Sequence, residues 1–295
     1  MIEPKKDLLC YLSISDADEA WGNVVTTVGY QSILPGSVYP LSRHPGVYDF
    51  KPQTGRILNE YQLVYITRGS GYFSSQSCKR QPIKAGTILL LFPGEWHSYY
   101  PDTKTGWDEY WVGFRGPSID RLVTGKFFSI KEPVLHLGVS ATLVNLYDEI
   151  IRFATEEKYG YQPLISGLVS HMLGYIFYKV KNNSFTNMYL VDKINEARAL
   201  MKDHMEEPLS PEKIASMLGL SYSLFRRTFK EYTGISPMKY QTQLKLLKAK
   251  ELLTSTSLTI SEIAYRLHFE NAGQFSTFFH KKEKSTPSDF RKRNH

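Results

Sequence analysis

The chain has 295 residues, 42% of them hydrophobic, and a formal net charge of +7, which allows two domains that each bury a core. Its two cysteines, Cys10 and Cys78, exclude a disulfide framework or a cysteine-based zinc site, and no uninterrupted apolar run approaches the length of a membrane span. Residues 1–7 lack the apolar core of a signal peptide, so we expect a cytoplasmic protein without membrane contact.

The positive charge is concentrated at one end of the chain. Residues 208–295 hold 15 Lys and Arg against 7 Asp and Glu, whereas the rest of the chain holds 21 against 22. A basic C-terminal region is expected of a surface that replaces counterions on nucleic-acid phosphates. A solvated basic surface without a partner would show the same charge, so the charge by itself leaves both interpretations open.

Residues 22–137 have the pattern of short strands separated by Gly and Pro. Residues 61–67 and 72–74 predict a hairpin, the apolar residues 88–92 predict a fully buried strand, and residues 107–114 predict another strand. Many short strands with little helix indicate a small β-barrel, which can hold one ligand between apolar walls.

An enzymatic barrel is the less favoured interpretation of this segment. A metal-dependent enzyme needs several His and a carboxylate around one ion, whereas the predicted hairpin has no His pair and His97 alone is expected to pack or to form hydrogen bonds. Ser70 lacks the strand-to-helix frame of a nucleophile elbow, and no phosphate-binding loop is present. We expect no enzyme, no metal and no cofactor; a metal-dependent enzyme joined to a second domain is the alternative.

Aromatic residues are frequent in and beside the presumed strands. Because successive side chains of a strand point to opposite faces, only about half of them can face the barrel interior. For each one taken singly, core packing is the simpler expectation. The residues are Tyr65, Trp96, Tyr99, Trp107, Tyr110 and Trp111.

Residues 139–181 show helical periodicity in two apolar stripes, with Gly160 and Pro163 between them. Such stripes cover the barrel or each other. The first consists of Leu143, Leu146, Tyr147, Ile150 and Ile151, and the second of Leu164, Leu168, Met172, Ile176 and Val180. Residues 182–190 are interpreted as a linker, because they begin with a polar stretch without periodicity. A helix over 192–205 is then expected to open the second domain.

Residues 209–293 contain one motif written twice. Its opening apolar pairs lie 49 positions apart and its later aromatic residues 50 apart, so the second copy has one extra residue in its turn. Each copy has the pattern of a helix-turn-helix. Ser210 and Ser221 are expected to cap the helices of the first copy, Gly219 to end its first helix, and Thr259 or Ser261 to cap the second copy.

The helix predicted over 238–253 joins the two copies. At about 24 Å it would hold two recognition helices close to one duplex turn apart. Phe225, Phe229, Phe275 and Phe279 recur at one offset in both copies and are assigned to their cores.

A helix-turn-helix places the polar face of its second helix in the DNA major groove. Arginine can donate two hydrogen bonds to guanine, so the first copy is expected to supply most base readout and the second, without arginine on this face, to fix register. The expected DNA contacts are Ser223, Arg226, Arg227 and Lys230 in the first copy, and Asn271, Gln274, Ser276, Thr277 and Lys281 in the second.

The duplicated region resembles the DNA-binding domain of the AraC/XylS family of bacterial transcription regulators. The resemblance is carried by residues 229–237 and 260–264, whereas His268 and Lys284 stand where the family usually has glycine. Residues 86–97 are similar to the second cupin motif of the family's sensor domain, and 101–107 to the turn that follows it.

The resemblance implies an α+β protein of two domains. A cupin-like β-barrel (1–138) with trailing helices (139–181) would be followed by a linker (182–190) and an all-α domain (191–295) with two helix-turn-helix units joined by a long helix. It further implies a transcription activator that binds double-stranded promoter DNA, responds to a small molecule in the barrel, and forms a homodimer through its trailing helices. A nucleoid protein without sequence specificity is a rival interpretation.

The resemblance also singles out residues in the barrel. Tyr99, Glu109 and Trp111 fall where an arabinose-responsive member of the family contacts its sugar, and Arg56 is a looser match. An aromatic face suits sugar C–H bonds, and a carboxylate and a guanidinium suit hydroxyls, so a carbohydrate effector is expected. The full expected ligand-binding set is Arg56, Tyr65, Trp96, His97, Tyr99, Glu109 and Trp111.

Overall fold

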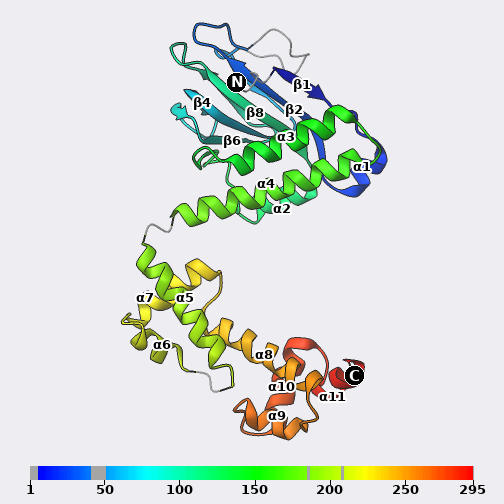
Figure 1. The fold of residues 1–295 in the computed structure, drawn as a ribbon, viewed down its shortest axis with the longest axis vertical. Coiled ribbons are helices and arrows are strands. Elements are labelled where there is room, and N and C mark those ends of the chain that lie inside the picture. Colours follow the sequence, from blue (N-terminus) through cyan, green and yellow to red (C-terminus); the bar gives the residue numbers. More distant parts are fainter. Residues whose placement is uncertain (1–5, 41–50, 185–186, 207–208, 295) are drawn as a thin grey trace. The chain divides into compact units, whose positions relative to one another are not determined.

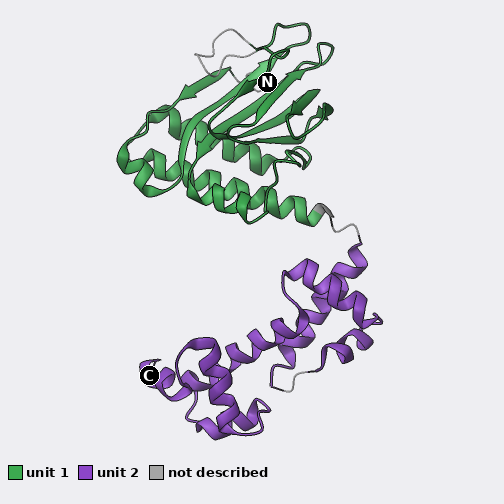
Figure 2. Ribbon diagram, turned by 180° about the vertical axis from the view of Figure 1, so that it is seen from behind, with its two compact units in different colours: residues 1–184 green, residues 185–295 purple. Residues whose placement is uncertain are grey.

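The computed structural model describes residues 6–40, 51–184, 187–206 and 209–294. The chain divides into two compact units, Met1–Ser184 and Phe185–His295 (Figure 2). Each described hydrophobic core is built from the residues of one unit.

The N-terminal unit is an antiparallel β structure with helices against one face (Figure 1). The main sheet has the order β1-β2-β8-β4-β6-β9, while β5 and β7 pair with β4, and β3 pairs with β7. The described strands are β1 (Leu8–Tyr11), β2 (Val24–Ile33), β3 (Arg56–Ile57), β4 (Tyr61–Ser75), β5 (Gln81–Lys84), β6 (Thr87–Leu91), β7 (Trp96–Pro101), β8 (Trp107–Arg115) and β9 (Val134–His136).

The long strand β4 belongs to two layers. Its first half pairs with β6 and β8, and its second half pairs with β5 and β7. Gly69 lies between the halves with φ +78°, and a Cβ there would clash with the backbone of Gly106, so this close crossing requires glycine. Apolar side chains from both layers enclose a shared core, which we call the barrel interior. They are Ile33, Val64, Ile66, Phe73, Ile83, Leu89, Leu91, Tyr99, Trp107 and Trp111.

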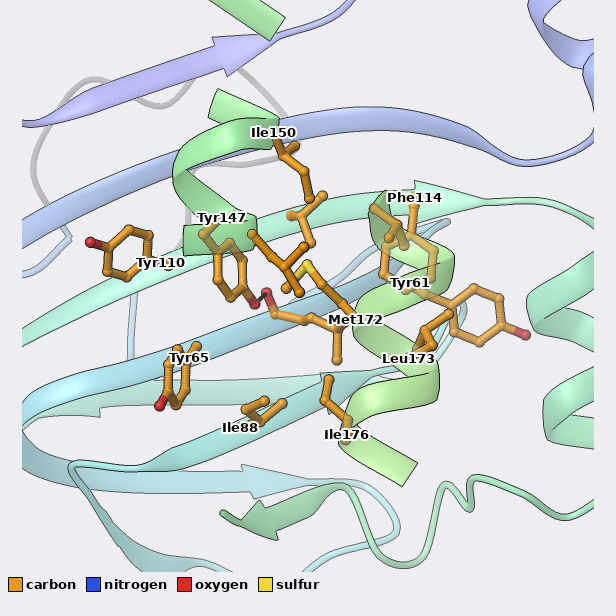
Figure 3. Packing of buried hydrophobic residues seen from close by; sticks show 14 of the residues in the cluster. Tyr61, Tyr65, Ile88, Tyr110, Phe114, Tyr147, Ile150, Met172, Leu173 and Ile176 are labelled. Atoms are coloured by element: carbon orange, nitrogen blue, oxygen red, sulfur yellow. Dashed lines mark hydrogen bonds between the residues drawn. The ribbon is translucent and has the colours of Figure 1, made fainter. Parts of the chain in front are cut away.

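Helices cover the other face of the main sheet. The unit contains α1 (Asp16–Trp21), α2 (Pro117–Thr124), α3 (Ala141–Glu156) and α4 (Tyr161–Ser184). Tyr147 of α3 lies between Tyr65 and Tyr110 of the sheet, and Met172 and Ile176 of α4 join the same core (Figure 3). The predicted cupin-like barrel with trailing helices is confirmed.

The second predicted stripe lies in or against the core except at its first residue, since Leu168, Met172, Ile176 and Val180 all pack there. Leu164 is 45% exposed, whereas Ile165, Val169 and Leu173 are buried beside Met172 and Ile176. The first stripe from Leu143 to Ile150 is buried as predicted.

The C-terminal unit is all-helical, as predicted (Figure 1). Its described helices are α5 (Met188–Asp203), α6 (Pro211–Met217), α7 (Tyr222–Thr233), α8 (Pro237–Ser255), α9 (Ile260–Arg266), α10 (Ala272–Glu283) and α11 (Pro287–Asn294). Helix α5 begins four residues before the predicted start, because Asn187 caps it. Helix α4 reaches Ser184, so helix occupies most of the span 182–190 expected as a linker, and residues 185–186 lie outside the described chain.

Helix α8 packs against both helix-turn-helix units. Its 19 residues span about 28 Å. Leu244 packs against the core of the first unit and Ala249 against that of the second, and at about 100° per residue these positions lie about 140° apart around the helix. Leu247, between these two contact positions, is 59% exposed. No described helix has the length and apolar character to cross a membrane.

Candidate functional site

The first helix-turn-helix consists of α6 and α7. The hydroxyl of Ser210 accepts a hydrogen bond from the Lys213 amide at 3.1 Å, and that of Ser221 accepts one from the Leu224 amide at 3.4 Å. Gly219 between the helices has φ +70°, the left-handed conformation that glycine adopts without steric cost. The predicted caps and turn are therefore present.

Helix α7 presents a polar face opposite its buried one. Phe225, Thr228 and Phe229 are buried in the unit, and Phe225 and Phe229 pack edge to face with ring centroids 5.5 Å apart. Positions 223, 226, 227 and 230 are exposed, and residues three and four apart share one helix face. Within the described chain, Arg226, Arg227 and Lys230 have no ion-pair or hydrogen-bond partner for their charged groups, so three cations of α7 face solvent.

The second helix-turn-helix consists of α9 and α10. Thr259 forms a reciprocal capping box with Glu262, which settles the choice left open between Thr259 and Ser261. The extra residue of this copy is Glu270, whose carboxylate accepts a hydrogen bond from the Gln274 side chain at 2.5 Å. Asn271 caps α10 by accepting from the Gln274 amide at 2.9 Å.

The expected contacts of the second copy are exposed except for one. Asn271, Gln274, Thr277 and Lys281 are exposed, whereas Ser276 is half-buried. Two of them already form local hydrogen bonds, so α10 offers fewer unpaired groups than α7.

The second copy keeps the turns of the first without their glycines. His268 has φ +53° and Lys284 has φ +56°, close to φ +70° at Gly219 and φ +80° at Gly234. Both side chains are exposed and cause no steric clash, so the free-energy cost of these residues comes only from their positive φ values.

Polar contacts attach the second helix-turn-helix to α8. Lys250 pairs with Glu283 of α10 at 2.7 Å, and the Arg291 guanidinium of α11 donates to the Leu253 carbonyl at 3.0 Å. Glu206, in the loop after α5, accepts from Arg266 of α9 at 2.7 Å. This ion pair connects the loop between α5 and α6 to the second helix-turn-helix.

A polar cluster lies within the barrel of the N-terminal unit. The Arg56 guanidinium donates to the Tyr99 hydroxyl at 2.8 Å and approaches the His97 ring nitrogen at 3.4 Å. It also approaches the Gln62 amide oxygen at 3.4 Å, and the Gln62 amide nitrogen donates to the Glu60 carboxylate at 3.1 Å. The amide thus bridges one cation and one carboxylate.

The second half of the cluster lies on β2 and β8. Glu109 accepts from the Tyr39 hydroxyl at 3.4 Å, and its strand neighbour Gln31 is 1% exposed with an amide nitrogen that has no partner in the described chain. The ring of Trp111 lies over Gly29, where any Cβ would clash with it. A buried donor without a partner is costly, so the Gln31 amide is available to a bound group.

Burial decides the ionisation of two groups here. Burial raises the pKa of Glu109 to about 8, against the lowering effects of the Tyr39 hydroxyl and the Arg56 charge. Burial, followed by the Arg56 charge, lowers the pKa of His97 to about 4. Near neutral pH both groups are therefore predominantly uncharged.

Two of the seven expected ligand-binding residues lie outside this cluster. Tyr65 faces the helices, where its hydroxyl donates to the Gly138 carbonyl at 3.0 Å and accepts from the Ser140 amide at 2.7 Å (Figure 3). The Trp96 indole donates to the Thr54 carbonyl at 2.8 Å on the opposite side of β7 from His97. Their places on the strands therefore correct both assignments, while Arg56, His97, Tyr99, Glu109 and Trp111 share the interior.

Sequence reasoning missed the polar partners of these five residues. Gln31, Tyr39, Glu60 and Gln62 were not singled out, although Gln31 and Gln62 stand among apolar strand residues. A buried polar side chain within an apolar strand is the signal that could have found them. Among the described residues, no group of three or more His, Cys, Asp or Glu is arranged to hold a metal ion.

These features define a protein that joins a small-ligand barrel to a double helix-turn-helix unit. Residues 35–173 match the AraC-like ligand binding domain, and residues 214–293 match a helix-turn-helix domain. The chain therefore belongs to the AraC/XylS family of transcription regulators, with a ligand-binding and a helix-turn-helix domain.

Similar curated proteins match about a third of this chain. The transcriptional activator RhaS of Enterobacter sp. (strain 638) is 34% identical over 99 residues, which cover 34% of this chain and 36% of the relative. RhaS of Salmonella arizonae is 35% identical over the same length. The chain thus spans about a third of the length of the relatives it matches.

Solved structures match a similar share of the chain. A transcriptional regulator with an AraC-type DNA-binding domain from Chromobacterium violaceum is 36% identical, with 35% of this chain and 92% of that chain covered and a TM-score of 0.34. The DNA-binding domain of AdpA in complex with a target DNA is 25% identical, with 34% and 90% covered and a TM-score of 0.32.

Proposed function

We propose that this protein binds a specific promoter sequence through its two helix-turn-helix units and activates transcription under the control of a small neutral sugar. The exposed cationic face of α7 is the observation that carries this proposal. Its three cations have no partner in the described chain and stand on the second helix of a helix-turn-helix, which enters the major groove in this class of motif.

The two helix-turn-helix units contribute differently to DNA recognition. Arg226 and Arg227 supply base readout, because arginine can bond guanine O6 and N7 together. In the second helix-turn-helix, Gln274 is paired with Glu270, so fewer side-chain groups remain free to contact bases. Lys281 of this helix-turn-helix contacts phosphate. Activation is supported by the name of the RhaS relatives, which are transcriptional activators.

Footprinting of the 295-residue chain on a selected binding site tests this division. Arg226→Ala is expected to weaken specific binding about 5- to 150-fold, which corresponds to the loss of about 1–3 kcal/mol. Gln274→Ala is expected to weaken it less. Arg152→Ala, which removes the same charge from α3 of the other unit, is the control.

Two results would contradict this assignment. Equal loss of specificity in Arg226→Ala and Gln274→Ala would remove the division between the units. A footprint that disappears with unspecific competitor DNA would instead support the nucleoid-protein interpretation, since such a protein has similar affinity for all sequences.

A neutral polyhydroxylated effector fits the barrel cluster. Glu109 and His97 are predominantly uncharged near neutral pH, and Arg56 and Glu60 carry opposite charges on either side of the Gln62 amide. The interior therefore offers hydrogen bonds without an excess charge. Trp111 and Tyr99 add aromatic surface for C–H groups.

A thermal-shift screen of sugars tests the effector. A ligand present at 100 times its Kd stabilises the native protein by about 2.7 kcal/mol, and Arg56→Ala is expected to abolish that shift. A stoichiometric metal found by elemental analysis, together with turnover of the sugar, would favour the metal-dependent enzyme instead.

The proposed homodimer forms through α4. Leu164, His171 and Tyr178 recur every seven residues on its exposed face, with Gly167 and Gly174 between them. This spacing suits a second helix, because residues seven apart share one face. Light scattering after size exclusion should give twice the chain mass, and Gly174→Glu should reduce it to the monomer mass.

A further inference from the structure

The first turn of α10 carries a polar side chain that its neighbours hold in place. Gln274 is exposed, and its amide nitrogen donates to the Glu270 carboxylate at 2.5 Å. The backbone amide of Gln274 also donates to the side-chain oxygen of Asn271 at 2.9 Å. The turn before α10 therefore holds both the backbone and the side chain of this residue.

The same turn is fixed in the core of the second helix-turn-helix. Phe269, next to Glu270, packs against Phe275 and Phe278 with ring centroids 5.4 and 5.2 Å away. The ammonium group of Lys245 on α8 lies 4.1 Å from the centre of the Phe269 ring. Aromatic packing thus anchors the backbone that carries Glu270, while the carboxylate itself is exposed.

The carboxylate decides which end of the Gln274 amide faces it. An ionised carboxylate only accepts hydrogen bonds, so it attracts the amide nitrogen and repels the amide oxygen. Glu270 uses one N–H of that nitrogen, which leaves the second N–H and the oxygen for another partner. Gln274 therefore presents one donor and one acceptor side by side.

This pair of groups matches one base in the DNA major groove. Adenine presents an acceptor, N7, beside a donor, the N6 amino group, whereas guanine presents two acceptors, N7 and O6. The Gln274 oxygen would accept from N6 of adenine but would lie against O6 of guanine. Gln274 is the third residue of α10, and the N-terminal residues of a recognition helix are those that contact base edges.

The first helix-turn-helix has no equivalent group. Phe225 and Phe275 occupy the same position in the two motifs, so the half-buried Leu224 corresponds to Gln274. The turn of the first copy, residues 219–221, is one residue shorter and contains no acidic side chain. A base contact by Gln274 would therefore be particular to the second helix-turn-helix.

We infer that Gln274 reads one adenine in the binding site, and that Glu270 is the positioning residue that makes it select adenine over guanine. Without the carboxylate, the amide can turn over and offer its two N–H groups to the acceptors of guanine. This inference rests on the proposed DNA-binding function and gives the second helix-turn-helix a base contact of its own.

Binding of the 295-residue chain to single-base variants of a site selected from random double-stranded DNA tests the inference. Each position of the site is changed in turn, and the dissociation constant is measured. At one position the wild-type chain is expected to bind adenine at least fivefold more tightly than guanine. Gln274→Ala identifies this position, because it should abolish the preference there and nowhere else.

Glu270→Gln separates positioning from the general effect of charge. It keeps the size of the side chain but replaces a group that only accepts by an amide, which can face either end of Gln274. It should lower the adenine preference at least threefold and leave unchanged the preference at the position that Arg226→Ala identifies. Added to Gln274→Ala, it should cause no further loss of adenine preference.

Asp203→Asn is the matched control, since it removes the same charge from the exposed end of α5. It should leave the adenine preference unchanged.

Uniform changes would overturn the inference. If Glu270→Gln raises affinity for all site variants equally, its carboxylate only repels phosphates; if it lowers them equally, the residue only stabilises the fold. A Gln274→Ala variant that keeps every base preference would show that Gln274 reads no base. These results leave the proposed function standing, provided that Arg226→Ala still relaxes specificity at its own position. If the wild-type chain selects no defined site, the proposed function fails, and this inference fails with it.

Discussion

Glu109 and His97 lie in one barrel interior, and folding shifts their proton affinities in opposite directions. Folding raises the pKa of Glu109 from 4.5 to about 8 and lowers that of His97 from 6.5 to about 4, in both cases chiefly through burial. The folded state therefore binds more protons than the unfolded chain at Glu109 and fewer at His97. Rising pH favours unfolding through Glu109 between 4.5 and 8, and falling pH favours it through His97 between 6.5 and 4.

The pH range from 6.5 to 8 isolates Glu109 from His97. Over that range the free energy of unfolding of the N-terminal unit should fall by about 2 kcal/mol, because one proton difference corresponds to about 1.4 kcal/mol per pH unit. Glu109→Gln should flatten this dependence, measured by urea unfolding at several pH values.

The control for this prediction is Glu132→Gln, which changes an exposed carboxylate in the same unit. It should keep the wild-type slope. A Glu109→Gln variant with an undiminished slope would show that another group carries the proton.

At the scale of the element, the N-terminal caps of the helix-turn-helix units were the most predictable features. Ser210 and Ser221 cap their helices as the sequence indicated, and Thr259 is one of the two caps it left open, because a cap depends on residues only three positions away. The first buried position of α4 was less predictable, since Leu164 and Ile165 could both begin its apolar stripe. Packing against the sheet selected Ile165.

The two left-handed turns of the second helix-turn-helix should be improvable. His268 and Lys284 hold positive φ values that cost an L-residue about 1–2 kcal/mol, and glycine recovers this at the expense of a more flexible unfolded chain. His268→Gly and Lys284→Gly should each stabilise the C-terminal unit by about 0.5–1 kcal/mol in thermal unfolding.

Lys282→Gly is the contrasting substitution for this prediction. It places glycine inside α10, where it should destabilise by about 1 kcal/mol. If His268→Gly and Lys284→Gly destabilise the C-terminal unit as much as Lys282→Gly, the exposed side chains of His268 and Lys284 must themselves stabilise that unit.

At the scale of the whole molecule, each unit depends on its own cores. Phe229 is fully buried in the first core of the C-terminal unit, and Phe73 is 1% exposed in the barrel interior. Phe229→Ala should destabilise the C-terminal unit by about 3–5 kcal/mol and leave sugar binding intact. Phe73→Ala should have the reverse effect.

Calorimetry with and without a bound sugar measures this separation. The sugar should shift only the transition of the N-terminal unit, and Phe229→Ala should lower only the other one. A single transition that both substitutions lower equally would contradict the separation.

The sequence by itself determined the class of this protein. Two copies of a helix-turn-helix, their caps, the basic C-terminal region and the strand pattern of residues 22–137 can be read locally, because each depends on neighbours along the chain. Tertiary structure alone decided which barrel residues meet. Both faces of β4 and β8 are covered, one by helices and the other by the second layer of strands, so both faces carry apolar side chains. The sequence of these strands therefore does not alternate between apolar and polar residues, and it does not show which side chains face the barrel interior. Tyr65 and Tyr99 are both aromatic residues in or beside predicted strands, so the sequence does not distinguish them. Only the pairing of strands places Tyr99 beside Arg56.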